Sequence, residues 1–246
     1  MSPGSIDYGV DVVFVIDSTE SMGPLIDTVK RNVATFHDQL LDAMYEKEKY
    51  ITSLRLRVVA FRDLIDDPGT GIFQIPFHQI PAHQEQFGTW VKSLEAAFGG
   101  EEEESSLEAL AEAITSDWDR GHDRRRHVIV LFTDGPAHSL EDTMNRLNQM
   151  GEWDEYLAAY PWYWQADDGQ HYEMPHTFAA LSELWTREPR PMEFAAKRLI
   201  LFAPQIQPWT TIAQSWGNTV FYPVKPDLGL TDIPFRQILS AIVQSV

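Results

Sequence analysis

Oxygen-bearing side chains follow two apolar segments of the chain, and their spacing suits the binding of a hard metal ion. Asp17, Thr19 and Ser21 alternate directly after the apolar run 11–16, and Asp134 follows a second apolar run at 127–133. Carboxylate and hydroxyl oxygens are the ligands that Mg²⁺, Mn²⁺ and Ca²⁺ prefer. A simpler alternative is that residues 17–21 cap the start of a helix, a frequent use of these residue types.

The elements around these residues predict an α/β fold. Unbroken apolar runs or β-rich segments indicate six strands, at 11–16, 54–61, 71–77, 127–133, 198–203 and 219–222. Apolar residues at helical spacing indicate helices at 24–47, 85–98, 106–114 and 233–243. The alternation predicts a doubly wound, mostly parallel six-stranded sheet flanked by helices, a Rossmann-like arrangement that binds ligands at the carboxyl ends of its strands. Asp17 and Asp134 both lie at such ends.

A long segment interrupts this alternation between residues 139 and 197. It contains four of the eight tryptophans, at positions 153, 162, 164 and 185, and is too long for an ordinary connection. We expect one domain spanning 1–246, with 139–197 as a helical, aromatic-rich insertion that holds one ordered loop at 161–169. Its aromatic side chains form either a small packed core or a surface for a partner or a carbohydrate.

Composition excludes several classes of function. The chain has no cysteine, which rules out disulfides, zinc–thiolate sites and thiol catalysis. Its formal net charge of −18 disfavours nucleic acid and anionic membrane surfaces as partners. No apolar run is long enough to cross a membrane, and residues 1–8 do not have the pattern of a signal peptide, so we expect a cytoplasmic protein. The basic run 124–126 is interpreted as the solvated start of a strand, with an anion-binding patch as the alternative.

Four segments together resemble the von Willebrand factor type A (VWA) domain. They are the residues 17–24 (DSTESMGP), the strand 57–63 (RVVAFRD), the Gly-Gly-acidic loop from residue 99 leading into 104–110, and the residues 131–136 (LFTDGP). The form of these segments is closest to that of intracellular microbial and protist signalling proteins. Residues 139–197 lie outside the resemblance.

The resemblance implies a metal-ion-dependent adhesion site. Asp17, Thr19 and Ser21 would be ligands from the first motif, Glu101 from the second loop and Asp134 from the third, around Mg²⁺ or alternatively Mn²⁺ or Ca²⁺. Thr19 stands where Ser is usual and keeps the hydroxyl. Glu101 stands where adhesion-type domains have a neutral Thr, and any of residues 101–104 could occupy that position. An acidic ligand there implies tight metal binding and weak binding of an acidic partner group.

Asp63 lies just after the second strand of this resemblance. Its carboxylate could approach the metal site, but we expect it to pair with Arg62 or Arg55 instead. The eight histidines show no metalloprotease spacing, so they are expected in solvated or core positions.

The motifs of common α/β enzymes are missing. The sequence has no phosphate-binding loop, no nucleophile elbow and no dinucleotide fingerprint. A phosphatase of the haloacid dehalogenase type would need a second Asp where Thr19 stands. We therefore expect a non-catalytic, metal-dependent module that binds another protein in a cytoplasmic complex, such as a subunit of an ATPase, kinase or phosphatase assembly. The alternatives are a metal-independent scaffold that binds through the Trp-rich insertion and, less favoured, a metal-assisted hydrolase.

Overall fold

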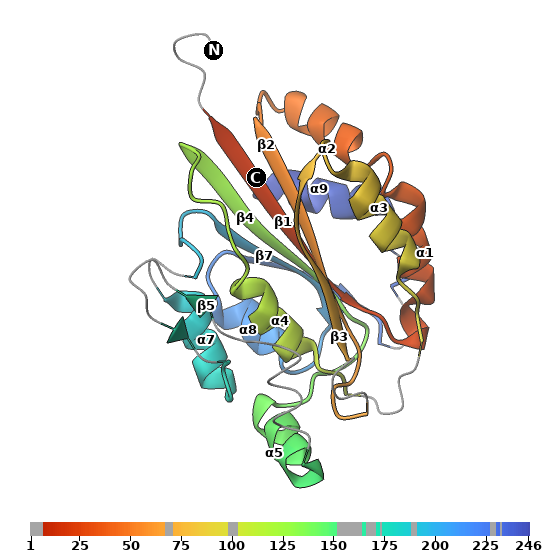
Figure 1. Cartoon of the computed structure of the whole chain (residues 1–246), viewed down its shortest axis with the longest axis vertical. Coiled ribbons are helices and arrows are strands. Elements are labelled where there is room, and N and C mark those ends of the chain that lie inside the picture. Colours follow the sequence, from red (N-terminus) through yellow and green to blue (C-terminus); the bar gives the residue numbers. More distant parts are fainter. Residues whose placement is uncertain are drawn as a thin grey trace.

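A six-stranded sheet lies between two layers of helices (Figure 1). The structure is a computed structural model and describes residues 7–66, 71–97, 103–151, 164–165, 171–172, 174–187, 191–226, 230–231 and 233–246. The strand order is β3-β2-β1-β4-β7-β8, and in this sheet only β3 runs antiparallel to its neighbour. The predicted α/β fold with a mostly parallel six-stranded sheet is therefore confirmed.

The bounds of the elements are as follows. The strands of the main sheet are β1 (Tyr8–Asp17), β2 (Ser53–Phe61), β3 (Ile72–Ile80), β4 (Arg124–Phe132), β7 (Lys197–Pro204) and β8 (Thr219–Val224). The helices described are the short 3₁₀ turn η1 (Glu20–Met22), α1 (Gly23–Asn32), α2 (Phe36–Tyr45), α3 (Gln84–Ser93), α4 (Ser106–Ile114), α5 (Leu140–Met150), α7 (Phe178–Thr186), α8 (Trp209–Ser215) and α9 (Phe235–Ser245). None of the helices within the described ranges is both long and apolar enough to span a membrane.

The central strand β1 is buried on both faces, which explains its unbroken apolar sequence. Successive side chains of a strand point to opposite faces. Val12 accordingly packs in the cluster under α1, α2, α3 and α9, whereas Val13 packs in the cluster under α4, α5, α7 and α8. Figure 1 shows these two helical layers on opposite sides of the sheet. A strand in this position needs apolar residues at both odd and even positions.

The single long helix expected at 24–47 is in fact two helices, α1 and α2. Polar side chains at the break bond to nearby main-chain oxygens: Asn32 Nδ2 donates to the Thr28 carbonyl (2.7 Å) and Thr35 Oγ1 to the Asn32 carbonyl (3.3 Å). Such local bonds compete with regular helix geometry. Val33 and Phe36 remain buried on either side of the break, so the apolar spacing continues through it.

The helices differ from expectation at two other places. The helix expected at 85–98 ends at Ser93, because Leu94 adopts an extended ψ of 133° and the Ala97 N–H then donates to the Ser18 carbonyl (3.1 Å) beyond β1. Helix α8 was not expected, since it is short and begins after Pro208.

The region 139–197 contains helices α5 and α7, in agreement with its expected helical character. It also contains a two-stranded antiparallel ladder between β5 (Trp164–Gln165) and β6 (His171–Tyr172), which lies partly within the stretch expected to be a loop. Most of that loop and the helical stretch around Trp153 lie outside the described residues. The assignment of 139–197 as an insertion in a single domain stays a prediction.

Candidate metal centre

The predicted site lies where three parallel strands end side by side. β1 pairs with β2 and with β4, and in this register Asp17 lies opposite Phe61 while Ile16 lies opposite Phe132. The loops that follow the three strands therefore begin at the same edge of the sheet. The first of these loops turns directly into the 3₁₀ turn Glu20–Met22, which returns Ser21 toward the end of β4.

The structure brings four of the five predicted ligands together as a connected series of oxygens. Thr19 Oγ1 lies 2.6 Å from Asp17 Oδ1 and 3.4 Å from Ser21 Oγ. Ser21 Oγ in turn donates to Asp134 Oδ1 over 3.1 Å, across 113 residues of sequence. The first and third predicted loops are thus joined through the side chains named from the sequence. Glu101, the fifth predicted ligand, lies outside the described residues.

Asp17 is the most constrained member of this series. Its side chain is buried, Oδ1 accepts from the Thr19 N–H (3.0 Å), and Oδ2 accepts from Thr133 Oγ1 (2.9 Å). Burial raises the pKa of Asp17 to about 6, with a further contribution from the negative charge of Asp134, although the Thr19 and Thr133 hydrogen bonds act in the opposite direction. Thr133 orients this carboxylate and was not among the predicted site residues.

Glu104 is the acid of the second loop that the described structure places at the site. Its N–H donates to the Pro136 carbonyl (3.3 Å) and its carbonyl accepts from the His138 N–H (3.0 Å), which ties the second loop to the third. Glu104 is 4% exposed, and its Oε2 has no hydrogen-bond partner among the described residues. Burial, followed by the negative charges of Asp17, Asp63, Asp66 and Asp134, raises the pKa of Glu104 to about 9. The sequence left open which acid in 101–104 approaches the metal.

A buried histidine beneath the site was missed. His138 Nε2 lies 3.3 Å from Asp63 Oδ2, and its Nδ1 lies 3.2 Å from Glu103 Oε2. Burial disfavours the charged imidazole, but the hydrogen bond to Asp63 and the nearby carboxylates outweigh this effect and raise the pKa of His138. The expected pairing of Asp63 with Arg55 is wrong: Arg55 binds Asp11 in two hydrogen bonds of 2.8 and 2.7 Å.

Glu108 is a second missed carboxylate. It is 2% exposed within α4, and in the described part of the chain neither of its side-chain oxygens has a hydrogen-bond partner. The Thr143 hydroxyl is near, but it donates to the Ser139 carbonyl (3.3 Å). Burial raises the pKa of Glu108 to about 7. A glutamate inside the apolar sequence LEALAEAI is the signal that could have identified it.

The donor set fits a hard divalent cation. Neighbouring oxygens around an octahedral Mg²⁺ are about 3 Å apart, given metal–oxygen distances of about 2.0–2.1 Å. The separations of 2.6, 3.4 and 3.1 Å in the series above bracket that value. Within the described ranges, no three His, Asp and Glu side chains are grouped closely enough to hold a metal by themselves. Any metal at this site would therefore need the hydroxyls of Thr19 and Ser21 as well as the carboxylates of Asp17 and Asp134.

Comparison with solved structures shows similarity over almost the whole chain at low sequence identity. The pilus adhesin SpaC from Lactobacillus rhamnosus GG is 11% identical with a TM-score of 0.52, and the match covers 98% of this chain and 32% of the adhesin. Proximal thread matrix protein 1 from the mussel byssus (12%, TM-score 0.47) matches over 98% of this chain and 48% of its own. The conserved hypothetical protein BatB from Bacteroides thetaiotaomicron (10%, TM-score 0.47) matches over 96% of both chains. The chain thus spans about a third of the adhesin, and at this identity the likeness concerns the fold alone.

No curated protein sequence matches the chain. The family model of the von Willebrand factor A domain matches residues 11–152, which is more than half of the chain and includes all four described ligands predicted from the sequence. Domains of this family in general mediate interactions between proteins. The chain therefore belongs to the von Willebrand factor A domain family.

Proposed function

We infer that this chain is a non-catalytic module that binds another protein through a surface organised by a divalent cation. The observation that carries this proposal is the series of oxygens from Asp17 through Thr19 and Ser21 to Asp134, which connects two loops at 2.6 to 3.4 Å. Asp17, Thr19, Ser21 and Asp134 would hold the ion, with Mg²⁺ favoured over Mn²⁺ or Ca²⁺. When bound, the ion supplies positive charge to a group of buried carboxylates.

The electrostatics of the metal-free site support this proposal. Asp17 and Asp134 are both at most 4% exposed, and Glu104 beside them has a pKa near 9. Taking carboxylates out of water is costly unless a positive charge compensates them. The nearby imidazole of His138 lies between Asp63 and Glu103, and these two carboxylates help to raise the pKa of His138. A dication at the oxygen series would compensate the carboxylates that His138 does not reach.

The accessible part of the site suits recognition. Ser21 and Glu20 are exposed at the start of the first helical turn, whereas Asp17 and Thr19 behind them are buried. The buried residues thus determine the position of the exposed ones. We propose that the partner is a protein in the cytoplasm, such as a subunit of an ATPase, kinase or phosphatase complex, and this choice is supported by the family resemblance of the motifs.

Thermal unfolding tests the metal part of the proposal. The full chain is treated with a chelator, dialysed, and then unfolded with increasing Mg²⁺, Mn²⁺ or Ca²⁺. An ion at about a hundred times its Kd adds about 2.7 kcal/mol to the free energy of unfolding. Ser21→Ala is expected to lose most of this gain, because it removes a hydroxyl that would hold the ion. Ser21 is exposed, so the substitution should leave the core intact. Ser93→Ala is the matched control, since Ser93 is also an exposed serine and lies on α3.

The outcomes separate the candidate functions. The metal centre would be refuted if none of the three ions increased the free energy of unfolding. It would also be refuted if an ion stabilised Ser21→Ala and Ser93→Ala equally. Capture of a partner that persists in chelator would favour a metal-independent scaffold acting through the tryptophan-rich segment. Metal-dependent hydrolysis of p-nitrophenyl phosphate that is lost in Ser21→Ala would instead favour a hydrolase.

A further inference from the structure

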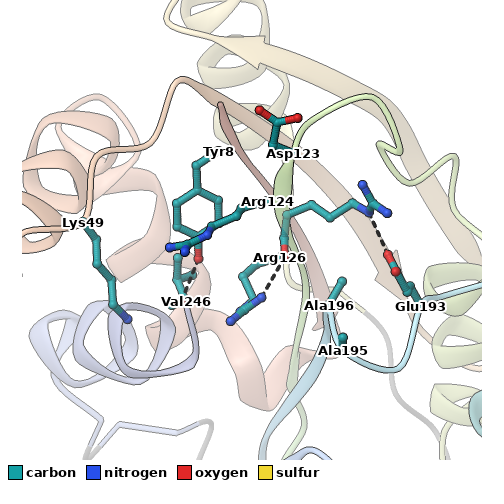
Figure 2. Close-up of a pocket in the computed structure, with 10 residues that line it drawn as sticks. Tyr8, Lys49, Asp123, Arg124, Arg126, Glu193, Ala195, Ala196 and Val246 are labelled. Atoms are coloured by element: carbon teal, nitrogen blue, oxygen red, sulfur yellow. Dashed lines mark hydrogen bonds and ion pairs between the residues drawn. The ribbon is translucent and has the colours of Figure 1, made fainter. Parts of the chain in front are cut away.

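A cavity of about 410 Å³ lies at the edge of the sheet opposite the candidate metal centre (Figure 2). It opens where β1 and β4 begin, and Tyr8, Lys49, Arg124, Arg126 and Val246 are among its lining residues. β4 starts at Arg124 and ends just before the loop that holds Asp134. At about 3.3 Å per residue, the two sites are roughly 30 Å apart.

Strand geometry separates the three consecutive arginines of β4. Arg124 and Arg126 lie on one face, next to Tyr8 and Val10 of β1 in the register of the sheet. Arg125 lies on the other face, where its Nε donates to Glu193 Oε2 (2.7 Å) and its Nη1 to the His122 carbonyl (2.7 Å). The apolar core on the first face ends at Val128, so the two remaining arginines extend that face into the cavity.

The positive charge in the cavity is not neutralised by ion pairs. In the part of the chain that the structure describes, no carboxylate lies within 4 Å of the charged groups of Lys49, Arg124 or Arg126. Arg126 Nε is buried, and none of the described residues accepts a hydrogen bond from it. Of the two acidic residues that line the cavity, Glu193 is engaged by Arg125, and the carboxylate of Asp123 points away from the other labelled side chains in Figure 2.

The nearby cations also affect one another. Burial lowers the pKa of Lys49, and the positive charges of Lys47 and Arg126 lower it further. Burial likewise lowers the pKa of Arg198, with Arg126 adding to the effect. A chain with a net charge of −18 thus gathers several like charges around one cavity, an arrangement that costs free energy unless an anion is bound.

Val246, the residue after α9, lines the cavity. The main-chain oxygen of Val246 accepts a hydrogen bond from the Tyr8 hydroxyl (2.7 Å), and within the described residues it forms no ion pair with Lys49, Arg124 or Arg126. Arg126 Nη1 donates to the Arg125 carbonyl (2.9 Å), which leaves its other donors available. In Figure 2, the side chains of Lys49, Arg124 and Arg126 surround Tyr8 and Val246.

We propose that this cavity binds a small phosphate-bearing molecule through Lys49, Arg124 and Arg126. Guanidinium groups bind phosphate oxygens through paired, charge-assisted hydrogen bonds, and lysine adds a compact positive charge. A volume of about 410 Å³ lies within the range of small-molecule sites. A long nucleic acid is disfavoured as the ligand, because the chain as a whole would repel its backbone.

Isothermal titration of the full chain with inorganic pyrophosphate and, separately, with glucose 6-phosphate tests this proposal. Chelator is present throughout, so that no metal can recruit phosphate to the other edge of the sheet. We expect saturable binding of at least one of the two probes. Arg124→Gln and Arg126→Gln should each weaken it about tenfold or more, as expected for the loss of hydrogen bonds to a charged group. Lys49→Gln should also weaken it, and it provides a partly exposed substitution that leaves β4 intact.

Arg31→Gln is the matched control, because it removes the same charge from an exposed position on α1. Its affinity should equal that of the wild type, as should that of Ser21→Ala at the candidate metal centre. Circular dichroism verifies that each variant is folded. No binding of either probe would overturn the proposal. So would an equal loss in Arg31→Gln and the cavity variants, because binding would then follow net charge alone.

Discussion

Replacing Glu104 by glutamine should stabilise the metal-free protein at neutral pH. Glu104 is 4% exposed, and no described residue forms a hydrogen bond with its Oε2. Burial, together with the charges of Asp17 and other nearby carboxylates, raises its pKa from 4.5 to about 9. At pH 7.5 the folded protein therefore holds Glu104 protonated, whereas the unfolded chain holds it ionised. Glutamine has nearly the same shape and carries no titrating proton.

The expected gain follows from proton linkage. Between pH 4.5 and 9 the folded state binds more protons at Glu104 than the unfolded state does, so the free energy of unfolding falls as pH rises through this window. At about 1.36 kcal/mol per pH unit, three units above pH 4.5 correspond to about 4 kcal/mol at pH 7.5. Glu104→Gln removes this cost, which raises Tm by roughly 10 °C for a chain of this length. At pH 4.5 and below, the gain disappears.

Thermal and urea unfolding in chelator, at pH 4.5 and pH 7.5, measure this difference. Glu95→Gln is the matched control, because Glu95 is exposed and its side chain makes no described interaction. It should change the free energy of unfolding by less than about 0.5 kcal/mol at either pH. A Glu104→Gln protein that is less stable than the wild type at pH 7.5 would refute the reasoning. An equal change at both pH values would show that the effect does not come from the titration of this carboxyl.

Three further predictions concern the same edge of the sheet. The affinity for Mg²⁺ should increase as pH rises from 5 to 7, because protons compete for Asp17, whose pKa is about 6; isothermal titration at pH 5, 6 and 7.5 measures this. Trp209→Phe removes the indole N–H that donates to the buried Gly135 carbonyl (3.0 Å), so urea unfolding should show a loss of about 1–3 kcal/mol, and Mg²⁺ binding should weaken with the loop. His138→Gln should lower the free energy of unfolding more at pH 6 than at pH 9. The pKa of His138 is raised in the folded state, so its protonation stabilises the fold at low pH, and this contribution is lost as pH rises through the folded-state pKa. Equal losses at both pH values would contradict this.

The strands of the fold could be predicted because burial on both faces of a sheet is visible in the sequence. Val12 and Val13 pack in different clusters, and only an unbroken apolar run satisfies both. The interruptions and ends of the helices were harder to predict from the sequence. Val33 and Phe36 preserve the apolar spacing across the break between α1 and α2, so periodicity reports the buried face and misses the interruption. The true end of α3 depends on the hydrogen bond from Ala97 to Ser18, which is distant in sequence.

The candidate site was predictable where its residues immediately follow buried strands. Asp17 and Asp134 lie near each other because β1 and β4 are parallel neighbours, and both residues were predicted at the carboxyl ends of strands. His138 and Asp63 were not predicted as a pair, since their contact joins the loops after β4 and β2 and no periodicity relates them. Arg55 was one of the two expected partners of Asp63, but it lies eight residues before Asp63 on β2, at the register position of Asp11.

The choice among four consecutive glutamates shows where local pattern stops being informative. Composition determines that an acid will lie between β3 and α4, but any of residues 101–104 satisfies that condition. The main chain of Glu104 is held by the Pro136 carbonyl and the His138 N–H, in a bridge between two loops that are distant in sequence. Because this pairing fixes the backbone of one residue next to Asp134, it determines which carboxyl is buried and thus which pKa is raised. The charge of the site therefore depends on how the two loops pair, and the pH dependence of Glu104→Gln tests that pairing directly.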